Sequence, residues 1–200
     1  YVDEIRFWGS PVGIFYPEGF IFVPVILKLI NVPIEVCYNI FVFIIFQLGV
    51  FASWLGFSRL TKSRWIGLLS TTLYISSGYY LIDAYIRSSL GELLGLSFMP
   101  LAISCIIDIV DDKDDISIER YIMPIFVISA IIESHVLSAV FLGIFAVVYI
   151  LLRYKQVSVL IVKRIATVFV TIFALNCTFI VPFLIFYRDV PIKVDFIEFF

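Results

Sequence analysis

Long uncharged apolar stretches are the feature of this sequence that most restricts its fold. Val36–Phe57 and Ile165–Tyr187 contain no Lys, Arg, Asp or Glu, the residues that are most costly at membrane depth. Each stretch is long enough to cross a hydrocarbon layer as an α-helix. Only 15% of the residues are charged, whereas a soluble domain has roughly 25%. The sequence therefore predicts an all-α, multi-pass transmembrane helix bundle whose main partner is the lipid bilayer.

Three further apolar segments are candidate spanning helices: Trp65–Ile82, Val136–Leu152, and Leu93–Ile107 with Leu90–Glu92 as its start. Two others are ambiguous. Tyr121–Ile132 is only about 18 Å long as a helix, and Gly13–Ile30 is apolar mainly in its second half.

Two basic segments orient these helices, because short cytoplasmic loops collect Lys and Arg. Such residues cluster in 58–64 and in 153–164. Four apolar segments separate the two clusters, and an even number of crossings places both on one side. We expect residues 58–64, 110–120 and 153–164 to be cytoplasmic. Gly13–Ile30 then need not cross, and is expected as an interfacial or re-entrant helix on the outer face.

The expected organisation is a single transmembrane domain, 1–200, that is a fragment of a larger protein. The chain starts with Tyr1 and shows no signal-peptide pattern. Residues 1–35 are expected to form an outer loop with a juxtamembrane helix, 36–187 about six apolar helices, and 188–200 the start of an outer segment.

Charge and cysteine content exclude several kinds of partner. A net charge of −2 offers no basic face for a nucleic acid. Cys37, Cys105 and Cys177 all lie inside apolar stretches, where cysteine behaves as a small buried hydrophobe. Their spacing suggests no metal site. No metal-ligating residues and no cofactor are predicted, and the use of a divalent cation stays open.

The segment between residues 79 and 92 carries the most informative charges. Asp83 and Arg87 are four residues apart and can pair on one helix face, and Ser89 with Glu92 matches a capping box. One interpretation is an ion pair beside a helix cap. The other is that Arg87 faces an outward cavity and binds an anionic group such as a phosphate, aided by the nearby helix N-terminus.

Two other groups of polar residues are candidates for chemistry. His135 is the only histidine; it is either a polar turn residue or a site residue that hydrogen-bonds a sugar or diphosphate, or shuttles a proton. Asp3 and Glu4 form an acidic pair that could act as a general base, or could simply be solvated loop charges.

Three stretches, in order, resemble a family of bacterial polytopic membrane proteins. They are residues 13–27 (GIFYPEGFIFVPVIL), residues 83–94 (DAYIRSSLGELL) followed by Met99-Pro-Leu101, and residues 133–138 (ESHVLS). The family is described as 6-pyruvoyl-tetrahydropterin synthase-related and is related to the YfhO-type proteins. Ser88 stands where a small residue such as Gly or Ala is expected after Arg87.

The resemblance implies a GT-C-like glycosyltransferase in the plasma membrane. Such a protein transfers a sugar from a polyprenyl-phosphate carrier to a cell-envelope acceptor at the outer face. By resemblance Arg87 contacts the carrier phosphate, Glu92 orients it and His135 lines the cavity, with Asp83 in the same motif. The general base would precede Tyr1, or be Asp3 or Glu4.

Two other functions remain open from the sequence: a flippase or transporter of a lipid-linked substrate, and a non-catalytic envelope scaffold. A transporter is expected to have charged or broken helices near the bilayer midplane. Here the polar residues gather at the outer ends of the apolar segments, which favours the enzyme.

Overall fold

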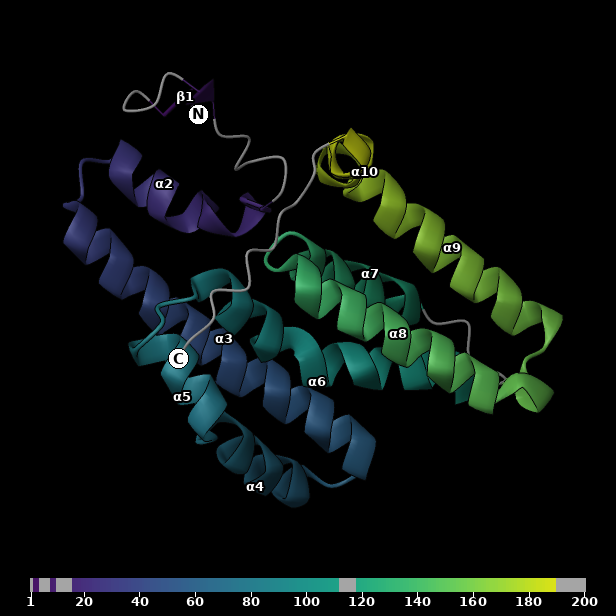
Figure 1. The fold of residues 1–200 in the computed structure, drawn as a ribbon. Helices are drawn as coiled ribbons and strands as arrows, with labels where there is room; N and C mark the ends of the chain where they lie inside the picture. The colour runs from purple at the N-terminus through teal and green to yellow at the C-terminus, as the bar shows by residue number, and fades with distance from the viewer. Residues whose placement is uncertain (1, 4–7, 10–15, 112–117, 190–200) are drawn as a thin grey trace, which may run out of the picture.

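The structure, a computed structural model, describes residues 2–3, 8–9, 16–111 and 118–189, and this part of the chain is almost entirely helical (Figure 1). In chain order the elements are β1 (Val2–Asp3), β2 (Trp8–Gly9), the 3-10 helix η1 (Gly19–Ile21), α2 (Phe22–Leu29), α3 (Ile34–Thr61), α4 (Arg64–Ile75), α5 (Gly78–Tyr85), α6 (Leu90–Asp111), α7 (Glu119–Ile132), α8 (Val136–Leu152), the 3-10 helix η2 (Tyr154–Gln156), α9 (Val159–Leu175) and α10 (Cys177–Asp189). The two short strands pair antiparallel. The predicted all-α class is confirmed.

Two of these helices, α3 and α6, are long and apolar enough to cross a membrane. The bent pair α9 and α10 would make a third span. Large apolar side chains such as Phe43, Leu73, Val147 and Phe169 are mostly exposed on the helices. Because a soluble monomer rarely exposes large contiguous apolar surface, this surface supports the predicted membrane protein.

The predicted span Trp65–Ile82 is wrong as a single helix, because the helix is interrupted between α4, which ends at Ile75, and α5, which begins at Gly78. The side chain of Ser77 caps the N-terminus of α5 and accepts a hydrogen bond from the backbone N–H of Tyr80 at 3.4 Å. A serine at this position offers the backbone an alternative to continuing the preceding helix.

The predicted span Ile165–Tyr187 is also divided. Helix α9 begins earlier, at Val159, and α10 turns away from it by 79° at Asn176. The amide nitrogen of Asn176 donates to the carbonyl oxygen of Ile172 at 2.7 Å and to the Oγ of Ser129 on α7 at 2.8 Å. The bend is therefore stabilised by a contact with another helix.

Helix α6 lies at the centre of the bundle and contacts α3, α5, α7, α8 and α9. Its approach to α3 is close because small residues of α3 face it. A β-carbon on Gly56 would lie 2.5 Å from the backbone nitrogen of Leu101, and Ser53 donates to the carbonyl oxygen of Ser97 at 3.4 Å. Small residues at such contacts are typical of helix pairs in membranes.

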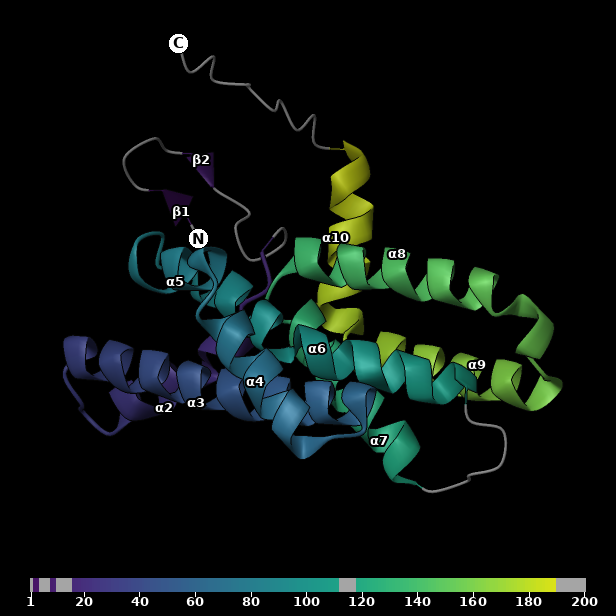
Figure 2. The same ribbon diagram turned by 90° about the horizontal axis from the view of Figure 1, so that it is seen from below.

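The C-terminal ends of α3, α6 and α8 meet at one end of the bundle (Figures 1 and 2). Arg59 pairs with Asp108 at 2.8 Å, and Arg153 with Asp111 at 3.2 Å. We name this the basic end; its basic residues are Arg59, Lys62, Arg64, Arg153 and Lys155. The two basic segments thus lie at the same end, as the even number of crossings predicts.

Helices extend further into the basic segments than the sequence suggested. Helix α3 continues through Arg59 to Thr61, where Lys62 adopts a left-handed conformation and ends it. Helix α9 includes Lys163 and Arg164. The predicted juxtamembrane helix forms as η1 and α2, and α2 packs along α3.

Candidate functional site

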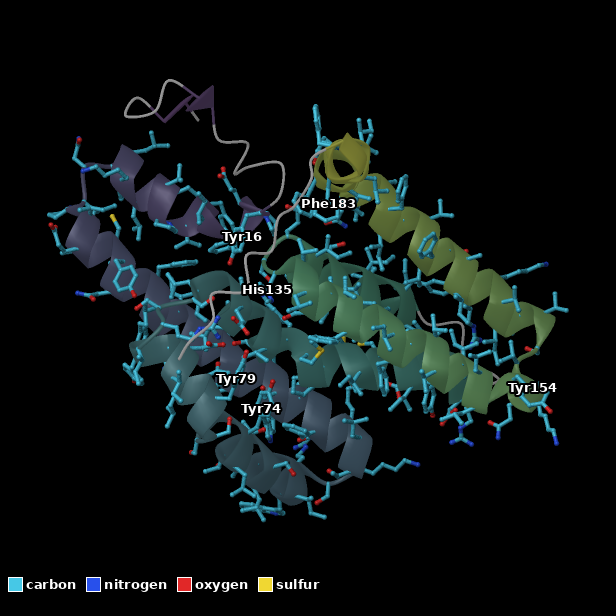
Figure 3. All side chains as sticks on the ribbon, in the orientation of Figure 1. Tyr16, Tyr74, Tyr79, His135, Tyr154 and Phe183 are labelled. Carbon is cyan, nitrogen blue, oxygen red and sulfur yellow. The ribbon has the colours of Figure 1, made fainter. Side chains whose placement is uncertain are left out.

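The end of the bundle opposite the basic end brings together polar side chains from several segments. They come from the stretch before η1, from α5 and the turn after it, from the start of α6, and from the break between α7 and α8. We name this group the polar cluster; its interacting members are Tyr16, Tyr79, Asp83, Arg87, Glu92 and His135. We include Glu133 with them because it lies two residues before His135 and against Gly19. Figure 3 shows Tyr16, His135 and Tyr79 within this region.

Arg87 is held between two carboxylates. Its Nη1 lies 2.6 Å from Oδ1 of Asp83, and its Nη2 lies 3.1 Å from Oε2 of Glu92. The predicted pair of Asp83 and Arg87 therefore forms, and Glu92 joins it. A tight turn makes this possible: Ser88 adopts a left-handed φ of 51°, and the N–H of Ser89 donates to the carbonyl of Asp83 at 3.1 Å.

The carboxylate of Glu92 is fixed by neighbours other than Arg87. The hydroxyl of Tyr79 donates to its Oε1, and the hydroxyl of Ser89 donates to its Oε2 at 3.4 Å. The predicted proximity of Ser89 and Glu92 is confirmed, with Ser89 directly before the first residue of α6. Because its carboxylate is fixed on several sides, Glu92 can hold the guanidinium of Arg87 in one orientation.

Asp83 and Arg87 differ sharply in exposure. The side chain of Asp83 is 0% exposed, whereas that of Arg87 is 49% exposed. The Oδ2 atom of Asp83 is buried without a hydrogen-bond partner among the described residues. Burial raises the pKa of Asp83, as does the charge of Glu92, while Arg87 partly offsets both. Asp83 is thus suited to hold Arg87 or to bind a proton.

His135 lies at the break between α7 and α8 and caps the N-terminus of α8. Its Nδ1 accepts a hydrogen bond from the backbone N–H of Ser138 at 3.4 Å and lies 2.8 Å from the hydroxyl of the same residue. When Nδ1 accepts, Nε2 is the ring nitrogen that carries a hydrogen and can donate. The ring of Tyr16 meets the imidazole edge-on, with centroids 6.5 Å apart.

Glu133, two residues before His135, lies against the N-terminal part of the chain. Its Oε2 would be 2.7 Å from a β-carbon on Gly19. Burial raises its pKa, and no hydrogen bond is found between its side chain and another described residue. A half-buried carboxyl with a raised pKa is a suitable general base, since its pKa lies nearer to the working pH.

The structure brings together four of the residues predicted from the sequence: Asp83, Arg87, Glu92 and His135. The structure does not show the predicted acidic pair, Asp3 and Glu4, as part of this group. Asp3 lies in β1, where its backbone pairs with Trp8, and Glu4 lies outside the described residues.

Sequence reasoning missed three members of the polar cluster. Tyr79 contacts Glu92 across the turn between α5 and α6. Tyr16 stands in the first of the resembling stretches and Glu133 in the third, but neither was singled out as a site residue. Tyr16 meets His135, and Glu133 meets Gly19, only because distant segments converge.

Among the described residues no group of three His, Cys, Asp or Glu side chains is placed to hold a metal ion. No protein-family model, curated protein or solved structure matches this chain.

Proposed function

We propose that the chain is part of a GT-C-like membrane glycosyltransferase. In this proposal the polar cluster binds the head of a polyprenyl-phosphate-linked sugar, and the sugar moves to a cell-envelope acceptor. The observation that carries the proposal is that Arg87 is held between Asp83 and Glu92 while its side chain remains half exposed. The ordered sequence resemblance supports the reaction class.

Arg87 retains donors for a phosphate. Guanidinium has five N–H groups in a planar fork, and each of the two ion pairs uses one terminal nitrogen, Nη1 with Asp83 and Nη2 with Glu92. Its position is fixed by Asp83 and Glu92 before any ligand arrives. Little side-chain freedom is then lost on binding, which favours affinity.

The charge balance of the polar cluster favours a head group with hydroxyls as well as a phosphate. Asp83, Glu92 and Glu133 outnumber Arg87, and three ionised carboxylates would repel an isolated phosphate. The raised pKa values of Asp83 and Glu133 reduce this repulsion. The same carboxyl groups are good acceptors for sugar hydroxyls, so a phosphate-linked sugar suits the whole cluster.

The reaction we propose is a direct displacement at the anomeric carbon. The acceptor hydroxyl oxygen forms a bond to that carbon as the bond to the phosphate oxygen breaks. Polyprenyl phosphate leaves with the bonding electron pair beside Arg87, and the hydroxyl proton passes to a carboxylate. Of the described residues, Glu133 suits the role of that base, while Glu92 orients Arg87 and His135 lines the cavity.

The orientation follows from the charges at the two ends of the bundle. Because Lys and Arg concentrate on the cytoplasmic side of membrane proteins, we propose that residues 58–64 and 153–164 face the cytoplasm, with 110–120 on the same side. The polar cluster then faces outward at the plasma membrane, where envelope acceptors lie.

One observation favours a second function, the flippase or transporter. Helices α9 and α10 meet at a 79° bend beside the buried side chain of Asn176. Broken helices with polar residues are typical of substrate sites in secondary transporters.

The deciding experiment uses the full-length protein in its native membrane. Glycosylation of envelope polymers is compared by mass spectrometry with the gene intact, deleted, or carrying Arg87→Ala or Glu133→Gln. We expect one sugar to disappear in the deletion strain and in both variants. Arg64→Ala, an exposed arginine at the basic end, is the matched control and should leave the polymers unchanged. An unchanged set of polymers in the deletion strain would contradict the transferase.

A further inference from the structure

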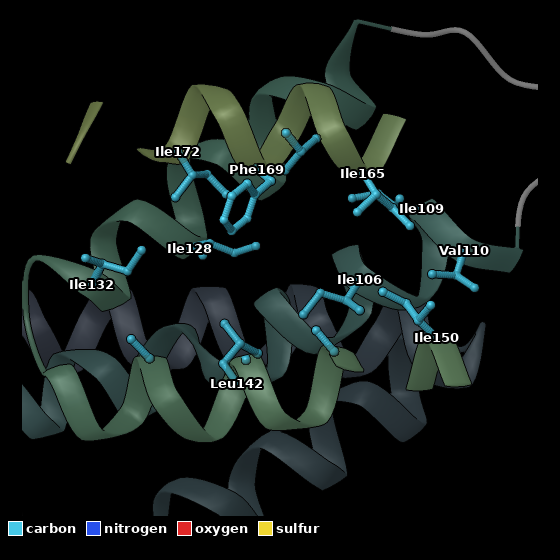
Figure 4. Close-up of a pocket in the computed structure, with 14 residues that line it drawn as sticks. Ile106, Ile109, Val110, Ile128, Ile132, Leu142, Ile150, Ile165, Phe169 and Ile172 are labelled. Atoms are coloured by element: carbon cyan, nitrogen blue, oxygen red, sulfur yellow. The ribbon is translucent and has the colours of Figure 1, made fainter. Parts of the chain in front are cut away.

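An apolar cavity of about 310 Å³ lies between α6 and α8 on one side and α7 and α9 on the other (Figure 4). Its floor includes the buried residues Ile109, Leu142 and Val168. Gly143 and Phe169 also line it and are exposed, so the cavity opens sideways to the surface of the bundle. We name this space the apolar groove.

The chemistry of the lining restricts what the apolar groove can hold. All of its lining side chains are aliphatic or aromatic hydrocarbon, or glycine. An ordered water needs two to four polar partners, and these walls offer none. The volume lies within the range of cavities that bind small molecules. The groove therefore suits a hydrocarbon occupant.

The apolar groove starts close to the polar cluster. Its lining includes Ile132, which directly precedes Glu133, and Ala139, which lies one helical turn after His135. From Ala139 to Ile150, which lines the other end, α8 rises about 16 Å. That is about half of the hydrocarbon thickness of a bilayer.

We propose that the apolar groove holds the hydrocarbon chain of the lipid whose head binds at the polar cluster. The head and the chain of one molecule would then occupy adjoining sites, with the chain entering sideways past Gly143 and Phe169. The identity of the lipid as a polyprenyl phosphate rests on the proposed function, whereas binding of a hydrocarbon chain does not.

The test uses the full chain reconstituted in phosphatidylcholine and phosphatidylglycerol vesicles. The probe is a long-chain alkyl phosphate that carries a diazirine in its chain, and labelled residues are identified by mass spectrometry after illumination. We expect labelling of Leu142 and Val168, which are buried and out of reach of bulk lipid unless a chain enters the groove. Excess unlabelled polyprenyl phosphate should reduce this labelling about tenfold, and added phospholipid should not.

A filling variant provides the control. A β-carbon at Gly143 would meet no atom within 4 Å, and Gly143 lines the groove. Gly143→Leu should therefore occupy part of the groove and reduce labelling of Leu142 and Val168. Val147→Leu enlarges an exposed side chain of the same helix; it should leave that labelling intact.

Two other labelling outcomes would overturn the proposal. Absence of label at Leu142 and Val168, with label on exposed residues such as Val147, would mean that the groove is closed or filled by protein. Equal competition by phospholipid would mean that it is occupied by bulk lipid. If labelling is as expected but no envelope sugar changes in the deletion strain, the apolar groove does bind a hydrocarbon chain and the proposed transferase function is wrong.

Discussion

A β-carbon on Gly91 would clash with the carbonyl oxygen of Ser134, so the start of α6 and the break between α7 and α8 are in direct contact. The hydroxyl of Tyr16 approaches the same point, 2.7 Å from such a β-carbon. Three segments of the polar cluster therefore meet at a position where only glycine fits.

Gly91→Ala should separate these segments. The backbone at Ser134 must move, and overpacking of this kind costs about 1–3 kcal/mol. We expect a lower midpoint of thermal unfolding in detergent together with loss of function. Gly143→Ala is the control, because its new methyl group meets no atom within 4 Å; it should be neutral or stabilising by up to about 1 kcal/mol. Equal midpoints for the two variants would refute the contact.

Gly56→Ala should destabilise the pairing of α3 and α6. Its β-carbon would lie 2.5 Å from the backbone of both Pro100 and Leu101, so a whole helix must shift, at a cost of about 1–3 kcal/mol. At Gly49 the nearest atoms are side-chain oxygens of Tyr80 and Ser97. We therefore expect Gly49→Ala to lower the unfolding midpoint less than Gly56→Ala, and the reverse order would contradict this packing.

Asn176→Ala should weaken the contact between α7 and the bend that joins α9 to α10. The change removes the hydrogen bonds to Ser129 and Ile172. Hydrogen bonds between helices in membranes contribute about 0.6 kcal/mol on average and at most about 1.7 kcal/mol. Thr171→Ala, which removes a bond only within α9, is the control. Steric trapping should detect a loss of unfolding free energy for Asn176→Ala and none for Thr171→Ala. Identical stabilities of the two variants would show that Asn176 does not stabilise this contact.

The stability of the protein should depend on the ionisation of Glu133. Burial raises the pKa of this carboxyl above its ordinary value of 4.5, so the folded state binds a proton more tightly than the unfolded state. The stabilisation that results is complete below pH 4.5 and is lost as the pH rises through the raised value. Glu133→Gln should remove this part of the decline in a series of unfolding measurements. If the stability of Glu133→Gln falls as steeply with rising pH as that of the native protein, the ionisation of Glu133 does not cause the decline.

The orientation of the bundle can be tested with single cysteines. An impermeant thiol reagent applied to intact cells should label Ser88→Cys beside the polar cluster, and should not reach Ser63→Cys or Lys155→Cys at the basic end. The background is a chain in which Cys37, Cys105 and Cys177 are replaced. Permeabilised cells provide the control, since all three positions should then react. Labelling of Ser63→Cys from outside would overturn the orientation.

Features that depend on neighbours along the chain were predictable from the sequence. Asp83 and Arg87 pair because they are four residues apart, and Ser89 meets Glu92 because helical geometry places them together. The common side of the two basic segments followed from counting apolar stretches. The paired residues are close in sequence. The shared end of the basic segments depends only on whether the number of apolar segments between them is even.

The polar cluster as a whole could not be predicted in this way. Tyr16 reaches His135 across more than a hundred residues, and Gly19 lies against Glu133 only because the stretch before α2 folds back onto the break after α7. The bend at Asn176 likewise depends on Ser129 of a different helix. No periodicity in the sequence encodes such contacts.

By itself, then, the sequence determined that this chain is helical and apolar enough for a membrane, because uncharged stretches must satisfy their backbone hydrogen bonds internally in lipid. It also determined the local charge pairs beside α6. Tertiary structure alone decided where the predicted spans break, how closely α3 approaches α6, and that Tyr16 and His135 meet at the polar cluster. These features depend on side chains of one helix occupying space left by another, and hydropathy does not record that space.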